Sequence, residues 1–381
     1  WKKWPSATSL NRPIVLGFFV FKRDEPMIDL NPYLKLMVTK QASDLFFTTG
    51  ACVQLKIDGV MRPIGDNRLE QGATAEVVRQ LLSDEEMAVL RRDLEMNFAQ
   101  EVDGIGRFRV NILWQRGDLA IVFRYIREQI PSIEELGLPA VLNKLVMEKT
   151  GLVLIVGSTG SGKSTSLAAM LDHRNTNITG HILTVEDPIE FSHANKRSIV
   201  NQREVGIDTH SYEQALKNAM REAPDVIMIG EIRDRDTMEQ AIRYSETGHL
   251  VLATLHSTSA PQAIQHVCNF FDDSELRRIN SDLSVNLKGV VAQRLVRDVD
   301  QKFAPATEVL INTPFMSELI ANGEHKGLRE AMEKSSDTAS HTFDSSLFEL
   351  FTAGRISRET ALANAYSKNN LDLQIRFGGA A

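Results

Sequence analysis

Cysteine is scarce in this chain of 381 residues, which holds Cys52 and Cys268 and no other cysteine. Two cysteines cannot form a disulfide framework or a four-cysteine zinc site. The low use of cysteine fits a reducing cytoplasm, where thiols stay reduced.

Long apolar runs and excess positive charge are also lacking. The longest apolar run near the start, Ile14 to Phe21, is interrupted by Gly17 and is too short to cross a bilayer, so we predict no transmembrane segment. The formal net charge is -7, which gives no general attraction to nucleic acid or anionic lipid. Basic and aromatic residues form no interleaved stripe, and we therefore predict no nucleic-acid partner.

What is present is an ordinary globular composition, with 43% hydrophobic and 24% charged residues. The length predicts two domains with appendages. Residues 1–26 begin with Trp and show no sustained period, so a non-native leader and a poorly ordered native extension both stay open. We expect an N-terminal domain over residues 27–127, a linker or hinge over 128–139 and a second domain over 140–381.

The first domain has the patterns of a small α+β fold. Its opening apolar residues recur at helical spacing, and the dipeptide Asp58-Gly59 lies between two strand-like runs, which predicts a hairpin. Ser83 and Glu86 predict a capping box at the start of a helix. Pro131, Gly137 and Pro139 are typical of a linker. The expected first helix and strands lie at Leu30–Val38, Ser43–Thr49, Val53–Ile57, Val60–Arg62, Arg107–Leu113 and Leu119–Tyr125.

The second domain has short, continuously apolar runs separated by helical patterns. This alternation predicts an α/β fold with a parallel sheet covered by helices on both faces. From about Asp273 the tail is expected to be mostly helical. Phe343, Leu347, Leu350 and Phe351 share one helical face there, and Gly354 is a plausible stop. The four strands are expected at Leu152–Val156, Ile182–Val185, Val226–Ile229 and Leu250–Leu255.

A glycine-rich segment at Gly157–Ser164 matches G-x-x-x-x-G-K-[ST] between a predicted strand and a predicted helix. Its backbone N–H groups can turn toward phosphates, and the helix N-terminus adds positive partial charge. We expect Lys163 to neutralise the β- and γ-phosphates and the Ser164 hydroxyl to bind Mg²⁺. The alternative is a glycine-rich turn with an incidental lysine, which would not be expected between a strand and a helix. The predicted residues for ATP are Gly157, Ser158, Thr159, Gly160, Ser161, Gly162, Lys163, Ser164 and Thr165.

Carboxylates follow two of the other predicted strands. Glu231 comes directly after the strand Val226–Ile229 and Gly230, and an acid at such a position lies near Mg²⁺ in P-loop enzymes, directly or through water. Glu186, Asp187 and Glu190 surround Pro188 after the preceding strand. These three carboxylates are either a solvated acidic turn or a group that polarises a water molecule or holds Mg²⁺ through water.

Two histidines, His249 and His256, lie at opposite ends of the strand Leu250–Leu255. They cannot both lie beside one phosphate. Ligands bind at the carboxyl ends of parallel strands, which favours His256 as the residue that senses the γ-phosphate.

Four segments in this order resemble the secretion and type IV pilus ATPase superfamily. They are the P-loop at 157–165, an Asp box at 183–191, a Walker B segment at 226–233 and a His box at 247–256. The resemblance runs from about Met27 to the C-terminus. It implies a PAS-like N-terminal α+β domain and a RecA-like P-loop ATPase domain with a mostly helical C-terminal tail.

Within this superfamily the chain is similar to the pilus-retraction group of PilT and PilU, a likeness that includes Ala42–Leu45 and Arg107–Asn111. The resemblance implies that Glu190 is the general base and that Glu231 serves the metal and the hydrolytic site. His249 and His256 would couple the phosphate to the neighbouring domain.

The same resemblance implies that Arg109 and Arg124 reach toward a phosphate across a domain or subunit junction. A guanidinium supplied in this way can be worth ~10³–10⁵ in rate. For each arginine alone, surface solvation or a salt bridge is the simpler interpretation.

Two departures from the PilT pattern favour the PilU-like branch, which resembles an accessory retraction ATPase. PilT-type enzymes carry an Ala-Ile-Arg-Asn-Leu-Ile helix, whereas the equivalent stretch here, Pro314–Ile320, lacks the arginine. Ser158 also stands where the P-loop of PilT has proline. The absent four-cysteine motif argues against pilus-assembly and type II secretion ATPases.

The expected function is therefore that of a cytoplasmic ATPase motor at the inner-membrane base of a pilus machine. The resemblance implies a homohexamer that couples hydrolysis to domain rotation, with an inner-membrane platform protein and a paralogous retraction ATPase as partners. Three alternatives stay open: a nucleotide-binding subunit that reinforces a paralogous motor, an assembly or secretion ATPase, and a nucleic-acid translocase.

Overall fold

The computed structural model describes residues 28–57, 59–334 and 339–377. The leader or extension expected over 1–26 lies outside these residues. The chain divides into two compact units, one of residues 1–97 and 110–124 and one of residues 98–109 and 125–381. The domain bounds expected from sequence stay a prediction.

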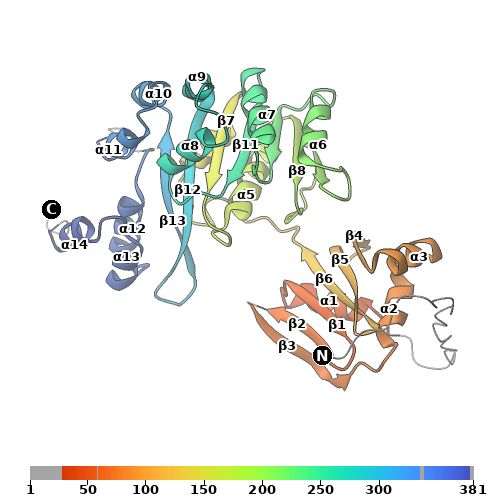
Figure 1. Ribbon diagram of the computed structural model, residues 1–381. Coiled ribbons are helices and arrows are strands. Elements are labelled where there is room, and N and C mark those ends of the chain that lie inside the picture. The colour runs from red at the N-terminus through yellow and green to blue at the C-terminus, as the bar shows by residue number, and fades with distance from the viewer. Residues whose placement is uncertain (1–27, 58, 335–338, 378–381) are drawn as a thin grey trace, which may run out of the picture. The chain divides into compact units, whose positions relative to one another are not determined.

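A six-stranded sheet in the N-terminal part of the chain has the order β3-β2-β1-β6-β5-β4, and β1 pairs antiparallel with both β2 and β6 (Figure 1). Buried Phe47 and Phe123, on the paired strands β1 and β6, pack edge to face. The elements are α1 (Asn31–Thr39), β1 (Asp44–Thr48), β2 (Cys52–Ile57), β3 (Val60–Arg68), α2 (Ala73–Leu81), α3 (Asp84–Asp93), β4 (Glu95–Val102), β5 (Gly106–Gln115) and β6 (Asp118–Ile126).

The predicted first helix, the hairpin and the capping box are confirmed. Strand β2 pairs antiparallel with β3, with Ile57 opposite Val60. The Ser83 side chain accepts from the Glu86 backbone, and the Glu86 side chain accepts from the Ser83 backbone. The sequence prediction missed α2 and β4, because α2 begins after Gly72 without a side-chain cap and β4 is a polar edge strand without a buried face.

The second unit is built on a seven-stranded sheet of order β13-β12-β7-β11-β10-β8-β9 (Figure 1). Its helices are α4 (Val141–Val146), α5 (Lys163–Asn177), α6 (Tyr212–Ala219), α7 (Arg235–Glu246), α8 (Ala260–Cys268), α9 (Leu276–Asn286), α10 (Pro314–Ala321), α11 (Leu328–Glu333), α12 (Phe343–Thr352), α13 (Arg358–Asn364) and α14 (Lys368–Phe377). Its strands are β7 (Gly151–Val156), β8 (Gly180–Glu186), β9 (Ser198–Glu204), β10 (Val226–Ile229), β11 (Leu250–Leu255), β12 (Leu287–Arg297) and β13 (Phe303–Ile311).

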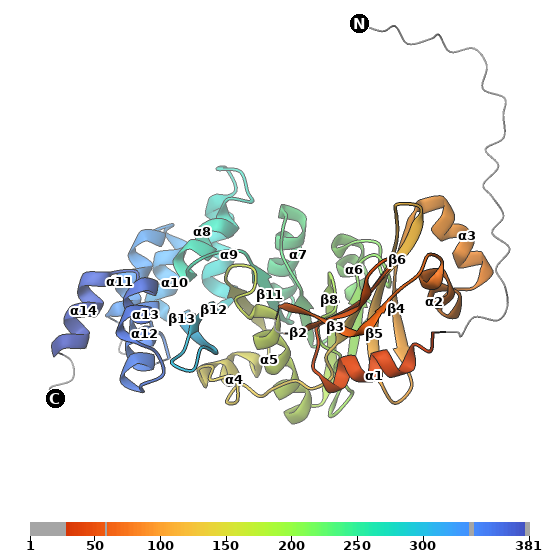
Figure 2. The same ribbon diagram turned by 90° about the horizontal axis from the view of Figure 1, so that it is seen from below.

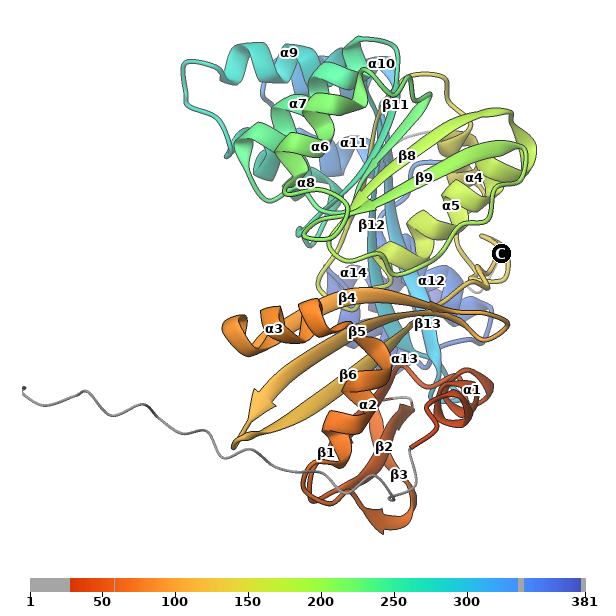
Figure 3. The same cartoon turned by 90° about the vertical axis from the view of Figure 1, so that its right-hand side faces the viewer.

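Both faces of this sheet are buried, as the continuous apolar strands predict. Along β7, Leu152 and Leu154 pack into one apolar cluster while Val153 and Ile155 pack into another. Helices α4 and α5 cover the second cluster, and α6 to α9 cover the first (Figures 2 and 3). The four predicted parallel strands are confirmed as β7, β8, β10 and β11.

The prediction of a mostly helical tail is confirmed, but it missed one hairpin. Strands β12 and β13 form an antiparallel hairpin, and β12 adds parallel to β7. Leu287, Val290 and Val291 fit helical spacing as well as a buried strand, so periodicity alone could not decide. Beyond this hairpin the described tail is helical, and α12 carries buried Phe343 and Leu347 as predicted.

The predicted linker is partly folded into the second unit. Ile133 and Leu138 are buried in the apolar cluster under α4 and α5. Ser132 and Glu135 exchange hydrogen bonds of 2.8 and 3.1 Å between side chain and backbone. The segment is therefore anchored from Ser132 onward. Among the described helices, none has the length and apolarity to cross a membrane.

Candidate active site

A cavity of about 700 Å³ opens at the carboxyl ends of four neighbouring parallel strands. The strands β7, β11, β10 and β8 lie side by side in that order, so the segments that follow them meet at one edge of the sheet. The cavity is lined by the loop after β7, the acidic turn after β8, Glu231 after β10 and His256 after β11. The sheet thus brings together residues almost a hundred positions apart in sequence.

The glycine-rich loop joins the buried strand β7 to the N-terminus of α5, as the motif predicts. Gly160 and Gly162 have φ values of 78° and 89°, a region that glycine adopts without strain. A Cβ atom on Gly162 would also lie 2.8 Å from Gln293 Nε2. The loop residues that line the cavity are Thr159, Gly160, Gly162, Lys163, Ser164 and Thr165.

The other predicted loop residues, Gly157, Ser158 and Ser161, are not among the described residues that line the cavity. The Ser161 hydroxyl is buried and has no hydrogen-bond partner among the described residues. Gly157 and Ser158 contribute backbone carbonyls, which accept from Lys163 Nζ at 2.8 and 3.0 Å.

Lys163 places a half-buried ammonium at the mouth of this loop. Burial lowers its pKa, and the charges of Glu231 and Glu190 oppose that shift. The first turn of α5 contains no acidic residue, so its free N–H groups face the cavity without a competing carboxylate. Such a cradle of amide donors and one cation fits a polyphosphate.

Glu231 is held by two neighbours. Its Oε1 lies 2.7 Å from His256 Nε2, and its Oε2 lies 2.8 Å from Arg233 Nη2. The carboxylate is mostly buried, with 19% of its side chain exposed. His256 therefore has a direct contact with the acid that follows β10, as its place at the carboxyl end of β11 allows.

The acidic turn after β8 separates its carboxylates by environment. Glu186 is buried, and its Oε1 accepts from Thr184 Oγ1 at 2.7 Å and from Gln202 Nε2 at 3.1 Å. Burial raises the pKa of Glu186 to about 7, against the effect of these hydrogen bonds. Glu190 is exposed and lines the same cavity. The turn thus offers one carboxyl that favours its proton and one that faces the cavity.

The structure does not bring His249 to this site. It lies at the opposite end of β11, where its Nδ1 is 3.2 Å from the Tyr244 carbonyl and its ring packs edge to face on Tyr244. The six residues of β11 separate the two histidines by on the order of 20 Å at the usual rise of a strand. The physical reason is the strand length, and His249 takes a local structural contact instead.

Arg109 and Arg124 are also absent from the described lining of the cavity. In the first unit, Arg124 Nε donates to Asp44 at 2.8 Å. Arg109 belongs to the second unit, where its Nη1 lies 3.6 Å from buried Glu204. The catalytic roles of these two arginines stay a prediction.

Other residues line the cavity that the motifs did not single out. Arg233 follows Glu231 by two positions, which is a signal that could have identified it. Arg127 reaches the cavity because its carbonyl accepts from Ser192 N at 2.9 Å beside the acidic turn, a contact without any sequence signal. Tyr212 comes from the N-terminus of α6.

A glycine-rich cradle between a buried strand and a helix, with carboxylates at the ends of neighbouring strands, defines a P-loop ATPase. The family of Type II/IV secretion system proteins matches residues 22–355, and the chain belongs to this family. Within it, the chain is an ATP-binding ATPase of the type IV pilus retraction and twitching-motility group.

Similarity to individual proteins extends over almost the whole chain. The type IV pilus ATPase PilU of Pseudomonas aeruginosa is 47% identical over 92% of each chain. The retraction ATPase PilT of the same organism is 38% identical over 90% of this chain and 100% of the relative. A crystal structure of the pilus retraction motor PilT with bound ADP superposes with a TM-score of 0.84, at 36% identity, over 91% of this chain and 99% of that one.

The raised pKa of Glu186 predicts that the stability of the second unit falls as the pH rises from about 4.5 to about 7. In this window the native state keeps a proton that the unfolded chain has released, so the free energy of unfolding decreases with pH. The shift corresponds to on the order of 3 kcal/mol. Chemical unfolding at pH 5, 6, 7 and 8 should show this loss in the unchanged protein and less of it in Glu186→Gln.

The exposed neighbour Asp187, changed to Asn, serves as the control and should keep the full slope. Burial raises the pKa of Glu308 too, so that residue contributes in all three proteins and cancels in the comparison. An equal pH slope in Glu186→Gln and the unchanged protein would contradict the prediction.

Proposed function

We propose that this chain hydrolyses Mg²⁺-bound ATP in the cavity at the carboxyl ends of β7, β8, β10 and β11. One observation carries the proposal: Lys163, Glu190, Glu231 and His256 come from four separate segments and line one cavity. Residues 157–165 would bind the phosphates, and Ser164 and Glu231 would hold the metal, Glu231 directly or through water.

The cradle provides the first part of the mechanism. The N–H groups at the start of α5 and the Lys163 ammonium line the cavity and would face the β- and γ-phosphates there. Lys163 now donates to two carbonyls of its own loop, so it is held at the loop and retains donor capacity for a phosphate oxygen. Mg²⁺ would neutralise charge on the phosphates, and the Ser164 hydroxyl is of the kind that binds it there.

The carboxylates of the acidic turn and Glu231 would have different roles in hydrolysis. Glu190 is the exposed carboxylate of the acidic turn, and it suits the role of a general base that orients water. Glu186 is buried and its Oε1 already accepts from Thr184 and Gln202, so it is less available to a water molecule than exposed Glu190. Glu231 is tied to His256 and Arg233, so a change at the phosphates that displaces Glu231 would reach His256 directly.

A ring of six copies is the proposed working assembly. Arg127 and Arg233 line the cavity, whereas Arg109 and Arg124 are paired elsewhere. The predicted roles of the last two would therefore require release from their present ion pairs and approach across a domain or subunit junction. Hydrolysis would then rotate one domain against the other. The chain is held to the second unit at Arg127 and again from Ser132, so a hinge at about residues 128–131 would require release of the Arg127 contact with Ser192.

The proposed place of work is the cytoplasmic side of the inner membrane at the base of the pilus. There the ring would act on a platform protein and draw pilin subunits out of the fibre beside a paralogous retraction ATPase. Support for an accessory role comes from Ser158, from Pro314–Ile320 without its arginine, and from the greater identity to PilU than to PilT.

Substitution of the two central residues should separate binding from chemistry. Lys163→Ala should lose both ATP affinity and turnover, because the cation at the phosphates is gone. Glu190→Gln should bind ATP with unchanged affinity but show a kcat lower by about 10²–10⁴-fold, the usual contribution of a general base. Binding by calorimetry and steady-state phosphate release measure both. Exposed Lys149, changed to Ala, is the matched control, and wild-type turnover in Lys163→Ala would refute the site.

The ring predicts a particle of six times the monomer mass of 42.6 kDa. Light scattering coupled to size exclusion, with and without ATP and Mg²⁺, measures that mass directly. A strictly monomeric protein at every working concentration, in both conditions, would eliminate the ring.

An accessory motor should depend on its paralogue in cells. Deleting this chain alone should weaken pilus retraction, and deleting the paralogue alone should abolish it, as followed by retraction imaging and phage sensitivity. Normal retraction by this chain without the paralogue would contradict the accessory role. A Lys163→Ala strain that twitches normally would instead identify a structural subunit that needs no turnover of its own.

A further inference from the structure

Another buried carboxylate, Glu308 on β13, lies outside the described lining of the nucleotide cavity. None of its side chain is exposed, and burial raises its pKa. Its Oε1 accepts from Ala260 N at 2.8 Å, and its Oε2 accepts from Phe343 N at 3.5 Å. Arg329 Nη2 lies 3.4 Å from the same Oε2. A buried carboxylate with these partners joins three segments far apart in the sequence.

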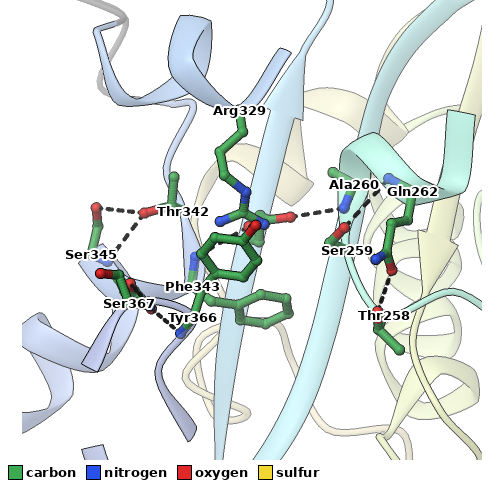
Figure 4. A network of polar contacts seen from close by, with 12 residues as sticks. Thr258, Ser259, Ala260, Gln262, Arg329, Thr342, Phe343, Ser345, Tyr366 and Ser367 are labelled. Atoms are coloured by element: carbon green, nitrogen blue, oxygen red, sulfur yellow. Dashed lines mark hydrogen bonds and ion pairs between the residues drawn. The ribbon is translucent and has the colours of Figure 1, made fainter. Parts of the chain in front are cut away.

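The two amide donors are the first residues of two helices. Ala260 begins α8 and Phe343 begins α12, after the capping residues Ser259 and Thr342. The N-terminus of a helix carries free N–H groups and positive partial charge, so one carboxylate between two such termini is favourable for both. Figure 4 shows this arrangement, with Ala260 and Ser259 on one side and Thr342 and Phe343 on the other.

One side of this contact leads to the nucleotide cavity. Helix α8 begins four positions after His256, whose Nε2 lies 2.7 Å from Glu231 Oε1. The short connection between them is held again from β12, because Arg294 Nη2 donates to the Thr258 carbonyl at 3.0 Å. Glu308 and Arg294 thus hold the chain four and two positions beyond His256.

The other side leads to the C-terminal helices. The guanidinium of Arg329, on α11, lies over the ring of Tyr366 at 3.7 Å from its centroid (Figure 4). Asp344, the second residue of α12, accepts from Tyr366 N and Ser367 N at 2.7 and 2.9 Å, directly before α14. Through these contacts α11, α12 and the start of α14 are joined at Glu308.

Arg294 provides a parallel connection. Its guanidinium lies 4.2 Å from the ring centroid of Phe343, and its Nη1 donates to the Asn364 carbonyl at 3.3 Å. The same side chain that holds Thr258 thus also contacts α12 and the end of α13. Two charged residues on adjacent strands, Glu308 and Arg294, bridge the His256 segment and the C-terminal helices.

We propose that Glu308 is a positioning residue for ATP hydrolysis, because it fixes the starts of α8 and α12 together, keeps His256 beside Glu231, and passes a movement of His256 to the C-terminal helices. This inference rests on the proposed function of the cavity. It adds a route by which the state of the nucleotide reaches a part of the protein that contributes no residue to the described cavity lining.

The variant Glu308→Gln tests the role with little change of volume. A glutamine can still accept from Ala260 N through its oxygen, but its amide nitrogen cannot accept from Phe343 N and carries no charge for Arg329. We expect unchanged affinity for ADP and a kcat lower by about tenfold, because a small misplacement of catalytic groups by a remote change can cost up to about 10²-fold in rate. Exposed Glu318 on α10, changed to Gln, is the matched control and should keep full activity.

Hydrogen exchange with and without ADP and Mg²⁺ gives the readout that a merely structural role would not move. In the unchanged protein, ADP should protect residues 157–166 and should also alter exchange at 341–350. In Glu308→Gln the first effect should persist and the second should vanish. Arg329→Gln, which leaves the backbone hydrogen bonds of Glu308 in place, should show the same loss in weaker form and serves if Glu308→Gln does not fold.

Several results would overturn the proposal. One is an unchanged kcat together with a retained ADP effect at 341–350 in the folded variant. Another is the absence of any effect of ADP on exchange at 341–350 in the unchanged protein. A third is a fall in kcat of Glu308→Gln that is fully explained by a smaller fraction of folded protein. Failure of ADP to protect 157–166 in the unchanged protein would instead refute the proposed function of the cavity.

Discussion

The parallel pairing of β7, β11, β10 and β8 is the constraint on which the site depends. Each of these strands is largely apolar and buried, and polar residues lie at or just after its end, so burial of the strands brings these polar residues to one edge of the sheet. The glycine-rich loop, the acidic turn, Glu231 and His256 meet because the strands are in register. The same register leaves His249 at the other edge. The site is therefore a consequence of sheet topology before any single side chain is considered.

Environment then gives similar side chains different chemistry. Glu186 and Glu190 are four positions apart on one turn, yet one is buried with a pKa raised to about 7 and the other is exposed to the cavity. Glu231 differs from both because a histidine and an arginine occupy its two oxygens. A carboxylate with a raised pKa, one that is free to orient water and one that holds neighbours can thus occupy one cavity. Residue type alone does not distinguish these roles.

Sequence reasoning succeeded where a local pattern has one physical interpretation. The P-loop motif, the four apolar strands and the capping box at Ser83 are of this kind. It failed for β12, whose apolar residues fit two periods, and for β4, which has no buried face. Arg127 and Glu308 could not be singled out because their neighbours come from distant segments. A lone glutamate in an apolar strand gives no indication that two helices begin beside it.

The hairpin that periodicity missed is also the part that connects the nucleotide site to the rest of the unit. Strand β12 adds directly to β7, and Gln293 on it accepts from Ser166 Oγ at 2.7 Å behind the P-loop. The next residue along β12, Arg294, donates to the Thr258 carbonyl near His256, and Leu295 after it lines the cavity. Strand β13 carries Glu308. Because side chains alternate across a strand, one hairpin can touch the P-loop on one face and the C-terminal helices on the other. A displacement at the phosphates would therefore have a short path to the helices at the end of the chain, through the Ser166–Gln293 hydrogen bond, the paired strands β12 and β13, and the contacts of Glu308.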